Sequence, residues 1–514
     1  MTPAAAPRDD PELAASATAT ATDEARDPSR SAAAASPSPP SWEDLYIIPS
    51  SFSDDDHGDD DDEDDEQHEG AAANGGAARA PGAVRAWPGA GPIVLLPGFG
   101  NDTEDYEAPF GQARRGLAPR LRRRGFVVET VRLRRREWLR VARAVASPAF
   151  WRGEADVGPG YRWYLVRVAA AVRRAERAWA EAEASEAAAE ADDGDGRAPR
   201  PTPGVTLVGH SAGGWLARGF IGDASLRPDA VAEAAQREED RALAALDEAS
   251  RGGGGALGAA LATAREVLFS RSLALEAAGP APRPCVERPH PSVGAVVTLG
   301  TPHTPPVGGR DVTGGALAWV NDLWPGAYFG AGGNGGAGRA APADGGRQIV
   351  YVTVAGRAVL APPSDVAVPR GSPPSYAREA YKTVAGSGVR GGAGTAASEA
   401  GKPPPAPAVV VGDAVVPLSV ASGGLPGADA RVVLDGVWHS MSRLGTFKDP
   451  PSASAGASGG GEGGGGGGAA KPSDDNAGAM RGVRPWYGSG GALDAWLAAL
   501  RDAEAAARGG GERI

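Results

Sequence analysis

From residue 91 onward the chain carries short apolar runs, several of them rich in β-branched side chains. Residues 92–96 and 205–208 have no strict alternation of polar positions, which predicts strands buried on both faces. Further strands are expected at 126–131, 293–299, 348–354 and 431–437. Strands that are buried on both faces are typical of parallel sheets.

Between these runs the apolar positions recur at helical spacing. Residues 161–190 predict a long helix, and shorter helices are expected at 106–124, 212–221 and 493–500. Residues 230–278 add helical segments of their own. Strands that alternate with helices predict an α/β fold, with a mostly parallel sheet covered by helices on both faces.

Composition divides the chain into a tail and one large domain. Residues 1–88 are rich in Ala, Ser and Pro and then acidic, which predicts disorder, apart from an apolar island at 42–48 that could dock on the fold. Residues 89–514 are expected to form the domain. Its insertions, at about 223–290 and 303–347, are placed as a cap or lid, and Gly-rich loops are placed at 386–405 and 452–480.

The net charge of −12 belongs to the tail. Residues 1–70 hold 20 acidic residues and three arginines, a net of −17, so the rest of the chain carries +5. Arginine is dense between Arg114 and Arg143, and this stretch predicts either a face that contacts anionic lipid or phosphate, or a solvated helix surface. Nucleic-acid binding is not expected, because no recognised module accompanies the charge.

Several other classes find no support. The lone Cys285 excludes an intramolecular disulfide, and the scattered histidines supply no spaced metal-ligand set. No phosphate-binding loop, membrane-spanning run or secretory signal is readable. We therefore expect no cofactor, no metal and no transmembrane segment, with the protein soluble inside the cell, in chloroplast or cytoplasm.

The strongest chemical signal is the run Gly209-His210-Ser211-Ala212-Gly213. It follows the strand at 205–208 and precedes a helix, which is the context of a nucleophile elbow, a sharp turn that exposes a serine hydroxyl. The alternative is a strand–turn–helix junction with an incidental serine.

A serine nucleophile needs a histidine base and an acid that orients it, in the chain order Ser, Asp or Glu, His. Three histidines follow Ser211. His290 is expected to be an exposed loop residue, and His303 comes too early to leave room for an acid, although it could line the pocket. His439 follows the strand at 431–437 and is the favoured base.

Asp413 is the favoured acid, because it lies between the strand at 348–354 and the one that precedes His439. The rivals are Asp365, in the loop after 348–354, and Asp435, which is too close to His439 in the chain to orient its ring. Asp413 next to Gly412 could also be an ordinary turn residue.

The oxyanion of an acyl-transfer intermediate needs two backbone N–H donors. One is expected from Ala212, which follows the serine. The other is expected from Phe99, since Gly98 and Gly100 let the backbone of residues 96–100 approach a substrate. The alternative for this loop is a plain glycine turn.

At this point the chain resembles a known group, the lipase/esterase-like α/β-hydrolases of plants, algae and cyanobacteria, akin to GPI inositol-deacylases. The resemblance covers most of 91–500 and none of the acidic tail. It is carried by the segments Leu96-Pro97-Gly98-Phe99-Gly100, Gly209-His210-Ser211-Ala212-Gly213-Gly214, Thr298-Leu299-Gly300-Thr301-Pro302-His303, Gly412-Asp413-Ala414-Val415-Val416-Pro417 and Leu434-Asp435-Gly436-Val437-Trp438-His439-Ser440.

The resemblance implies an α/β-hydrolase fold with Ser211 as nucleophile, Asp413 as acid and His439 as base. The chain departs from the group at Ala414, where a glycine is usual. If this position has a positive φ, alanine costs roughly 1 kcal/mol there.

The sequence thus predicts a serine ester hydrolase that acts on an apolar or lipid ester through an acyl-enzyme. Aromatic residues of the second insertion suit an apolar acyl pocket, although a purely structural cap is equally consistent; they are Trp319, Trp324, Tyr328 and Phe329. The alternatives are an acyltransferase that uses the same three residues, and a non-catalytic binding protein that keeps the fold.

Overall fold

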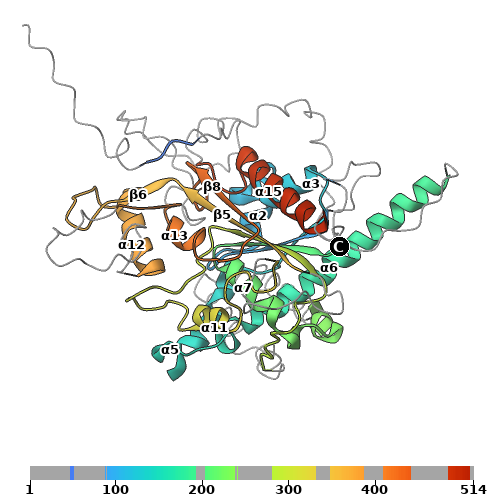
Figure 1. Ribbon diagram of the computed structural model, residues 1–514, viewed down its shortest axis with the longest axis horizontal. Helices are drawn as coiled ribbons and strands as arrows, with labels where there is room; N and C mark the ends of the chain where they lie inside the picture. Colours follow the sequence, from blue (N-terminus) through green and yellow to red (C-terminus); the bar gives the residue numbers. More distant parts are fainter. Residues whose placement is uncertain are drawn as a thin grey trace, which may run out of the picture. The chain divides into compact units, whose positions relative to one another are not determined.

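The predicted apolar runs become the strands of a six-stranded sheet in the computed structural model of the protein. Its strand order is β2-β1-β3-β4-β5-β8, and every neighbouring pair is parallel (Figure 1). The strands span Ile93–Leu96 (β1), Val128–Thr130 (β2), Val205–His210 (β3), Val293–Leu299 (β4), Val350–Arg357 (β5) and Ala430–Asp435 (β8). Because all six strands run the same way, their carboxyl ends share one edge of the sheet.

The structure describes residues 47–50, 87, 90–192, 203–234, 236, 237, 240, 281–331, 348–386, 409–441 and 484–509. The chain divides into two units, Met1–Ser41 and Trp42–Ile514, and all the described residues belong to the second. Nearly all of the predicted tail, most of the helical segments predicted at 230–278, and the Gly-rich loops except Gly386 lie outside the described residues.

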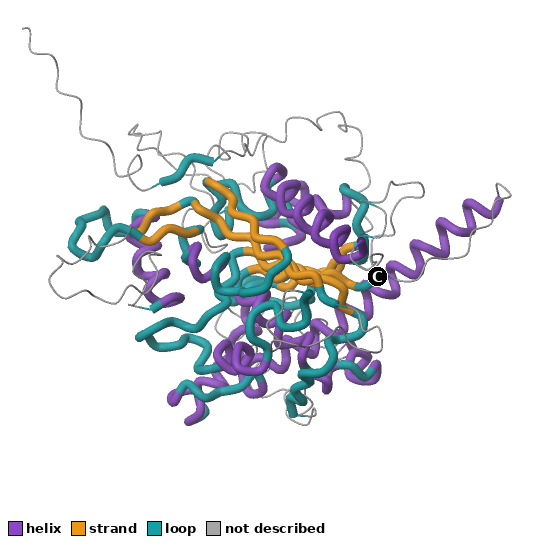
Figure 2. The backbone as a smooth tube through the Cα atoms, in the orientation of Figure 1, coloured by secondary structure: helices purple, strands orange, loops and turns teal. Residues whose placement is uncertain are grey.

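Alternate residues of each strand enter two separate cores. In β1, Val94 and Leu96 join the core beneath α6 (Gly158–Asp192) and α7 (Ala212–Gly222), whereas Ile93 and Leu95 join the core beneath α3 (Leu117–Arg123) and α15 (Gly490–Gly509). Figure 2 shows helices on both sides of the strands. This burial of both faces explains why the strands read as continuous apolar runs, and it confirms the predicted α/β class.

The helices that pack on the sheet follow the predicted stripes in three cases out of four. Helix α6 spans Gly158–Asp192, α7 spans Ala212–Gly222 and α15 spans Gly490–Gly509. Within the described part of the chain, no helix combines the length and the apolar character needed to cross a bilayer.

The continuous helix predicted at 106–124 is wrong. The segment is broken into α2 (Glu104–Glu107), two 3₁₀ turns, and α3 (Leu117–Arg123). Pro109 offers no backbone N–H to a helix, and Phe110 and Gly111 have φ values of 55° and 78°, which a right-handed helix does not contain.

Two three-residue strands that the sequence does not predict form a second sheet. Strand β6 (Val359–Ala361) pairs antiparallel with β7 (Val410–Gly412). Ile47, from the apolar island at 42–48, forms an antiparallel bridge to Val359, and this contact agrees with the predicted docking of that island. Strand β7 ends immediately before Asp413, so the small sheet positions that residue.

The other helices lie in the connections. They are 3₁₀ helix η4 (Arg135–Val141), α4 (Ala142–Val145), α5 (Pro148–Arg152), η5 (Ala224–Leu226), α11 (Ala316–Leu323), α12 (Pro373–Ala385) and α13 (Leu418–Ala421).

Candidate active site

Ser211 stands at the junction of β3 and α7 with an unusual backbone. Its φ of 53° and ψ of −124° lie outside the regions that L-residues favour. A Cβ on Gly209 would lie 2.4 Å from Gly214 Cα, and one on Gly213 would lie 2.2 Å from the Leu96 carbonyl oxygen. The flanking glycines are therefore required by close backbone packing, as the elbow interpretation expects.

The loop that follows β1 lies directly against this serine. A Cβ on Gly98 would come within 2.7 Å of Ser211 Cβ. The exposed ring of Phe99 packs edge-on against Trp138, with the ring centroids 5.1 Å apart. Among the hydrogen bonds of the described residues, neither the Phe99 nor the Ala212 amide has a protein acceptor. Two N–H donors are thus available near Ser211, on the residues that the sequence selected.

Asp413 is 1% exposed, and its carboxylate accepts four hydrogen bonds. One oxygen accepts from the Val415 and Val416 amides at 3.0 and 2.7 Å. The other accepts from Tyr487 Oη at 2.7 Å and pairs with His439 Nδ1 at 2.8 Å. Because an ionised carboxylate only accepts, these contacts place a proton on Nδ1 of His439, which makes Nε2 the ring nitrogen that can take a proton from a substrate-side group.

His439 is also close to the serine motif. Its ring centroid lies 4.5 Å from that of His210, the residue before Ser211, and its backbone N–H donates to the Asp413 carbonyl at 2.9 Å. A hydrogen bond between Ser211 Oγ and His439 is not among those formed by the described residues. The structure thus brings Asp413 and His439 into contact and sets their pair beside the serine motif.

The rival acids lie elsewhere. Asp365 is exposed in the turn that follows β6. Asp435 forms a two-oxygen ion pair with Arg357, at 2.5 and 2.7 Å, on the exposed part of β8. Neither has a hydrogen bond to a histidine within the described ranges, which leaves Asp413 as the acid that contacts one.

The expectation that His290 is exposed is wrong. It is 4% exposed and stacks on Phe220 at 4.7 Å, because the loop folds back over α7. Burial, together with the charges of Arg227 and Arg173, lowers the pKa of His290 to about 3. His303 is completely buried, and its Nε2 bonds to Thr298 Oγ1 at 3.0 Å rather than to an acid.

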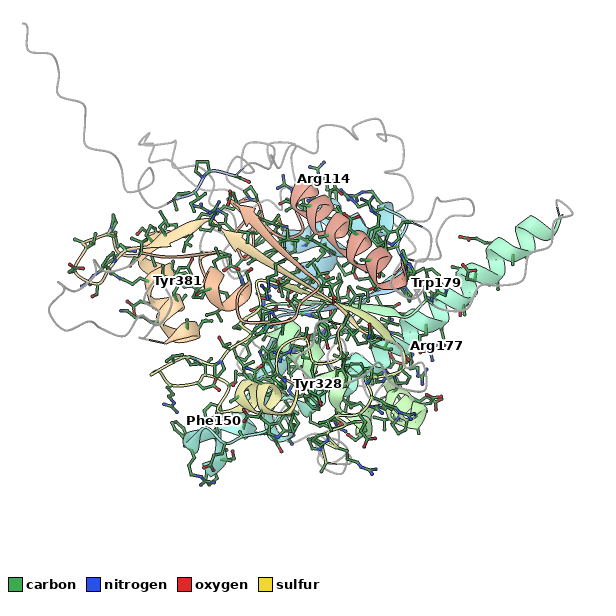
Figure 3. The ribbon with its side chains drawn as sticks, in the orientation of Figure 1. Arg114, Phe150, Arg177, Trp179, Tyr328 and Tyr381 are labelled. Carbon is green, nitrogen blue, oxygen red and sulfur yellow. The ribbon has the colours of Figure 1, made fainter. Side chains whose placement is uncertain are left out.

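Ala414 has a φ of 84° and is fully buried. This conformation favours glycine, so Ala414 carries the backbone strain that was expected for alanine at a position with positive φ. Tyr381, on α12 (Figure 3), holds the strained peptide, because its hydroxyl accepts from the Ala414 amide at 3.0 Å. The strain does not displace Asp413, whose carboxylate keeps all four of its partners.

Several arginines of the dense stretch between Arg114 and Arg143 form contacts within the fold. Arg122 pairs with Glu107 at 2.6 Å, and Arg135 pairs with Asp105 at 2.6 Å. Arg120 is buried and donates to the Gly488 carbonyl at 2.7 Å. The side chains of Arg122 and Arg135 remain 34% and 41% exposed in these pairs, so both sequence interpretations of the stretch stay predictions.

The predicted aromatic cluster serves packing more than it lines a pocket. Trp324 is 1% exposed, and a Cβ on Gly222 would lie 2.1 Å from its ring. Trp319, Tyr328 (Figure 3) and Phe329 are partly buried against the same core.

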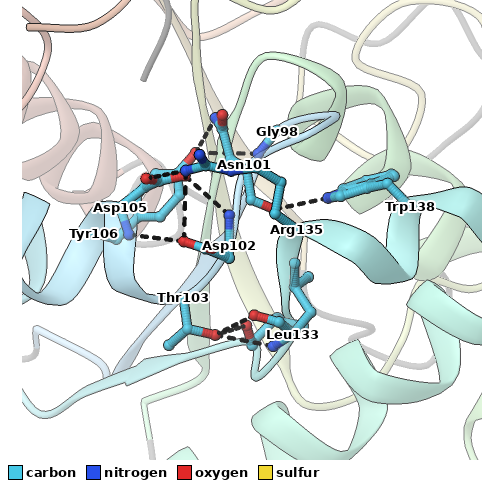
Figure 4. A network of polar contacts seen from close by, with 10 residues as sticks. Gly98, Asn101, Asp102, Thr103, Asp105, Tyr106, Leu133, Arg135 and Trp138 are labelled. Atoms are coloured by element: carbon cyan, nitrogen blue, oxygen red, sulfur yellow. Dashed lines mark hydrogen bonds and ion pairs between the residues drawn. The ribbon is translucent and has the colours of Figure 1, made fainter. Parts of the chain in front are cut away.

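Three side chains of the site were not assigned a role from the sequence. Tyr487 donates a hydrogen bond to Asp413. Tyr106 is hydrogen-bonded to His210, the residue before Ser211, and Figure 4 shows the other contacts of Tyr106. His210 was visible only as a variable position inside the motif. The available signal was the polar His210 at the end of the apolar run 205–208, whereas Tyr106 lies in the polar segment 101–107 and had no such signal.

Comparisons with protein-family models, with curated proteins and with solved structures find no match to this chain. A functional assignment therefore depends on the geometry described above.

Proposed function

We propose that the protein is a serine ester hydrolase with an α/β-hydrolase fold. Ser211 is the nucleophile, His439 is the general base, and Asp413 orients and stabilises His439. The observation that carries the proposal is the strained backbone of Ser211, with φ 53° and ψ −124°, next to the hydrogen-bonded pair of Asp413 and His439. Such strain persists only where the surroundings impose it, and it is the backbone conformation expected of a nucleophile elbow between β3 and α7.

The order of the parts supports the same class. The serine follows β3, the acid follows β7 and the histidine follows β8, which is the order Ser, Asp, His of α/β-hydrolases. The sheet that carries the serine and the histidine is parallel throughout, so both residues follow strands that end at the same edge.

In the reaction, Ser211 Oγ attacks the ester carbonyl carbon and His439 Nε2 takes the hydroxyl proton. The tetrahedral intermediate then expels the alcohol, which receives that proton from His439. Water next attacks the acyl-enzyme, gives a proton to His439, and releases the carboxylic acid as Ser211 regains its proton. No group outside the protein and water is needed to balance these steps.

The negative charge on the former carbonyl oxygen is held by the amides of Phe99 and Ala212. Both lack a protein acceptor among the described residues, and Gly98 packs against Ser211. Preorganised donors of this kind typically contribute about 3–4 kcal/mol each to transition-state stabilisation.

We extend the proposal to esters with an apolar acyl or lipid part. The ring of Phe99 is 58% exposed, one residue from the glycine that touches Ser211, and Leu139 is 53% exposed beside Trp138, on which Phe99 packs. Exposed apolar side chains next to a reactive hydroxyl favour an apolar substrate over a polar one.

A fluorophosphonate probe tests the proposal on the full-length protein, with the labelled peptide mapped by mass spectrometry. We expect stoichiometric labelling at Ser211, no labelling of Ser211→Ala, and full labelling of Ser419→Ala, which removes an exposed serine from α13. Turnover of nitrophenyl esters of increasing acyl length then reports the preferred chain.

Absence of labelling in the wild type, under conditions that label a control esterase, would overturn the proposal in favour of a non-catalytic binding protein. Transfer of the acyl group to added glycerol in preference to water would instead make the enzyme an acyltransferase.

A further inference from the structure

One buried hydroxyl connects the loop beside Ser211 to the interior of the site. Tyr106 Oη accepts from the Gly98 amide at 3.1 Å and from Asn101 Nδ2 at 3.1 Å (Figure 4). It also lies 2.8 Å from His210 Nδ1. A phenol has one donor and two acceptor positions, so these three contacts use all of them, with the hydroxyl proton directed at His210.

The second ring nitrogen of His210 forms a hydrogen bond to the backbone of His439. Its Nε2 lies 3.0 Å from the backbone carbonyl oxygen of His439. A carbonyl only accepts, so Nε2 carries the proton and Nδ1 accepts from Tyr106. His210 is thus neutral with one defined tautomer. Burial and the neighbouring His439 agree with this, since both lower the pKa of His210 well below its ordinary value.

His439 is consequently held at three points. Asp413 accepts from its backbone amide at 2.9 Å and from its ring Nδ1 at 2.8 Å. His210 donates to its carbonyl at 3.0 Å. The third contact comes from the residue before Ser211, so it fixes the backbone of His439 relative to the serine motif itself.

We propose that Tyr106 and His210 are positioning residues, which join the Gly98 loop, the serine turn and His439 into one hydrogen-bonded unit. The inference rests on the proposed function, because positioning matters only if the oxyanion donors and the base act together. It goes beyond that function in assigning a role to two residues that touch neither the substrate nor the reacting atoms.

The loop has other anchors, so the fold does not depend on the Tyr106 hydroxyl. Trp138 Nε1 donates to the Asn101 carbonyl at 2.7 Å, and the Asp102 amide donates to Asp105 at 3.0 Å. Tyr106 itself keeps its buried ring when it is replaced by phenylalanine. A Tyr106→Phe variant is therefore expected to fold, with its loop held less firmly at Gly98.

The first test is the kinetics of Tyr106→Phe on a nitrophenyl ester. We expect kcat to fall at least tenfold while KM stays within twofold, because the affected groups act mainly in the transition state. Reaction with the fluorophosphonate should slow by a similar factor. The matched control is Tyr161→Phe, which removes the hydroxyl of another buried tyrosine that has no hydrogen-bond partner among the described residues.

The second test is rescue at His210. His210→Gln can retain an N–H donor toward the His439 carbonyl, whereas His210→Phe retains none, so kcat should follow the order wild type, Gln, Phe. Because Tyr106 and His210 share one network, the double variant Tyr106→Phe/His210→Phe should lose much less than the product of the two single losses.

A kcat of Tyr106→Phe within twofold of wild type, or independent losses in the double variant, would overturn the inference. That failure is distinct from failure of the proposed function, which would appear as an unlabelled Ser211 in the wild type. A readout without turnover is the ¹⁵N spectrum of selectively labelled histidine, which is practical with six histidines in the chain. The His210 ring, assigned by the signal that is lost in His210→Gln, should stay neutral with its proton on Nε2 from pH 5 to pH 8, and its Nδ1 signal should move in Tyr106→Phe. Protonation of the His210 ring within this range would also contradict the inference.

Discussion

Ala414 adopts a backbone conformation in which its methyl group is unfavourable, with φ at 84°. An L-residue in this region costs roughly 1–2 kcal/mol relative to glycine. A glycine substitution also removes a buried methyl and adds unfolded-state entropy, and these two effects oppose the relief of strain. Only a matched comparison isolates the strain.

We therefore predict that Ala414→Gly destabilises the protein less than Ala377→Gly does, by about 1–2 kcal/mol in the free energy of unfolding. Ala377 is equally buried but lies inside helix α12, where φ is ordinary. Urea denaturation of the two variants measures the difference. Equal losses in both would show that the strain at residue 414 is negligible.

For the acid of the proposed site, the sequence left Asp365 as an alternative to Asp413. Asp413→Asn keeps the shape but offers an amide to His439 Nδ1, which disfavours the tautomer that the base needs, so kcat is expected to fall on the order of 10³–10⁴-fold. Asp365→Asn should stay within twofold, since Asp365 is exposed and has no hydrogen bond to a histidine among the described residues. Full activity in Asp413→Asn would remove Asp413 from the site.

At the scale of single residues, the sequence singled out the three residues that we propose to react, but not the residues that contact them. Ser211, Asp413 and His439 stand in local patterns that chemistry makes recognisable. Tyr106, His210 and Tyr487 act through partners that are 104, 229 and 74 residues away in the chain. Such contacts exist only after the sheet has brought the loops together, so no local pattern encodes them.

Among the elements, predictability follows burial. Strands β1, β3, β4 and β5 were located within a few residues, because a central parallel strand must be apolar at almost every position. Strands β6 and β7, with three residues each, are too short for any periodicity to register. The segment 106–124 has helical apolar spacing, but local backbone chemistry at Pro109 and Gly111 overrides it.

The junction of η4 with α6 depends on a buried charge cluster. Glu137 receives two bonds of 2.6 Å from Arg167 and also lies 3.6 Å from Arg140. Burial alone would raise the pKa of Glu137. The charges of the two arginines, with hydrogen bonds from Arg167 and the Arg134 amide, outweigh burial and lower it to about 2.

Glu137→Gln should therefore lower the free energy of unfolding at pH 7 by about 3–5 kcal/mol, since two buried guanidinium groups lose their counter-charge. The folded pKa is depressed, so this stability is complete above the unfolded pKa near 4.5 and disappears as the pH falls toward 2. The difference in the free energy of unfolding between wild type and variant, measured by urea denaturation, should therefore become smaller between pH 6 and pH 3. The control Glu379→Gln, in an exposed pair with Lys382, should change stability by less than about 1 kcal/mol at either pH.

At the scale of the whole described unit, three buried histidines make the free energy of unfolding depend on pH in mild acid. His210, His290 and His303 are at most 4% exposed, and burial, together with nearby positive charge, lowers the pKa of each in the folded state. Unfolding returns each ring to an ordinary pKa near 6.5. Below that pH the unfolded chain binds up to three more protons at these sites than the folded chain does, so stability falls as the pH falls.

The three rings together remove about 4 kcal/mol of unfolding free energy between pH 7.5 and pH 5.5, at roughly 1.4 kcal/mol each. Asp105 opposes them, because burial and the charge of Asp102 raise its pKa to about 6 against the contacts with Arg135. Protonation of Asp105 in the folded protein raises the free energy of unfolding by about 1 kcal/mol over the same interval, so the effect of the histidines is larger.

His290→Gln, which deletes one titrating ring, should reduce the pH-dependent loss of stability by about 1.4 kcal/mol, measured as the change in urea-derived stability between the two pH values. If wild type and His290→Gln lose the same stability over this interval, the ring at 290 is accessible to protons in the folded protein, and its burial under the loop that follows α7 is wrong.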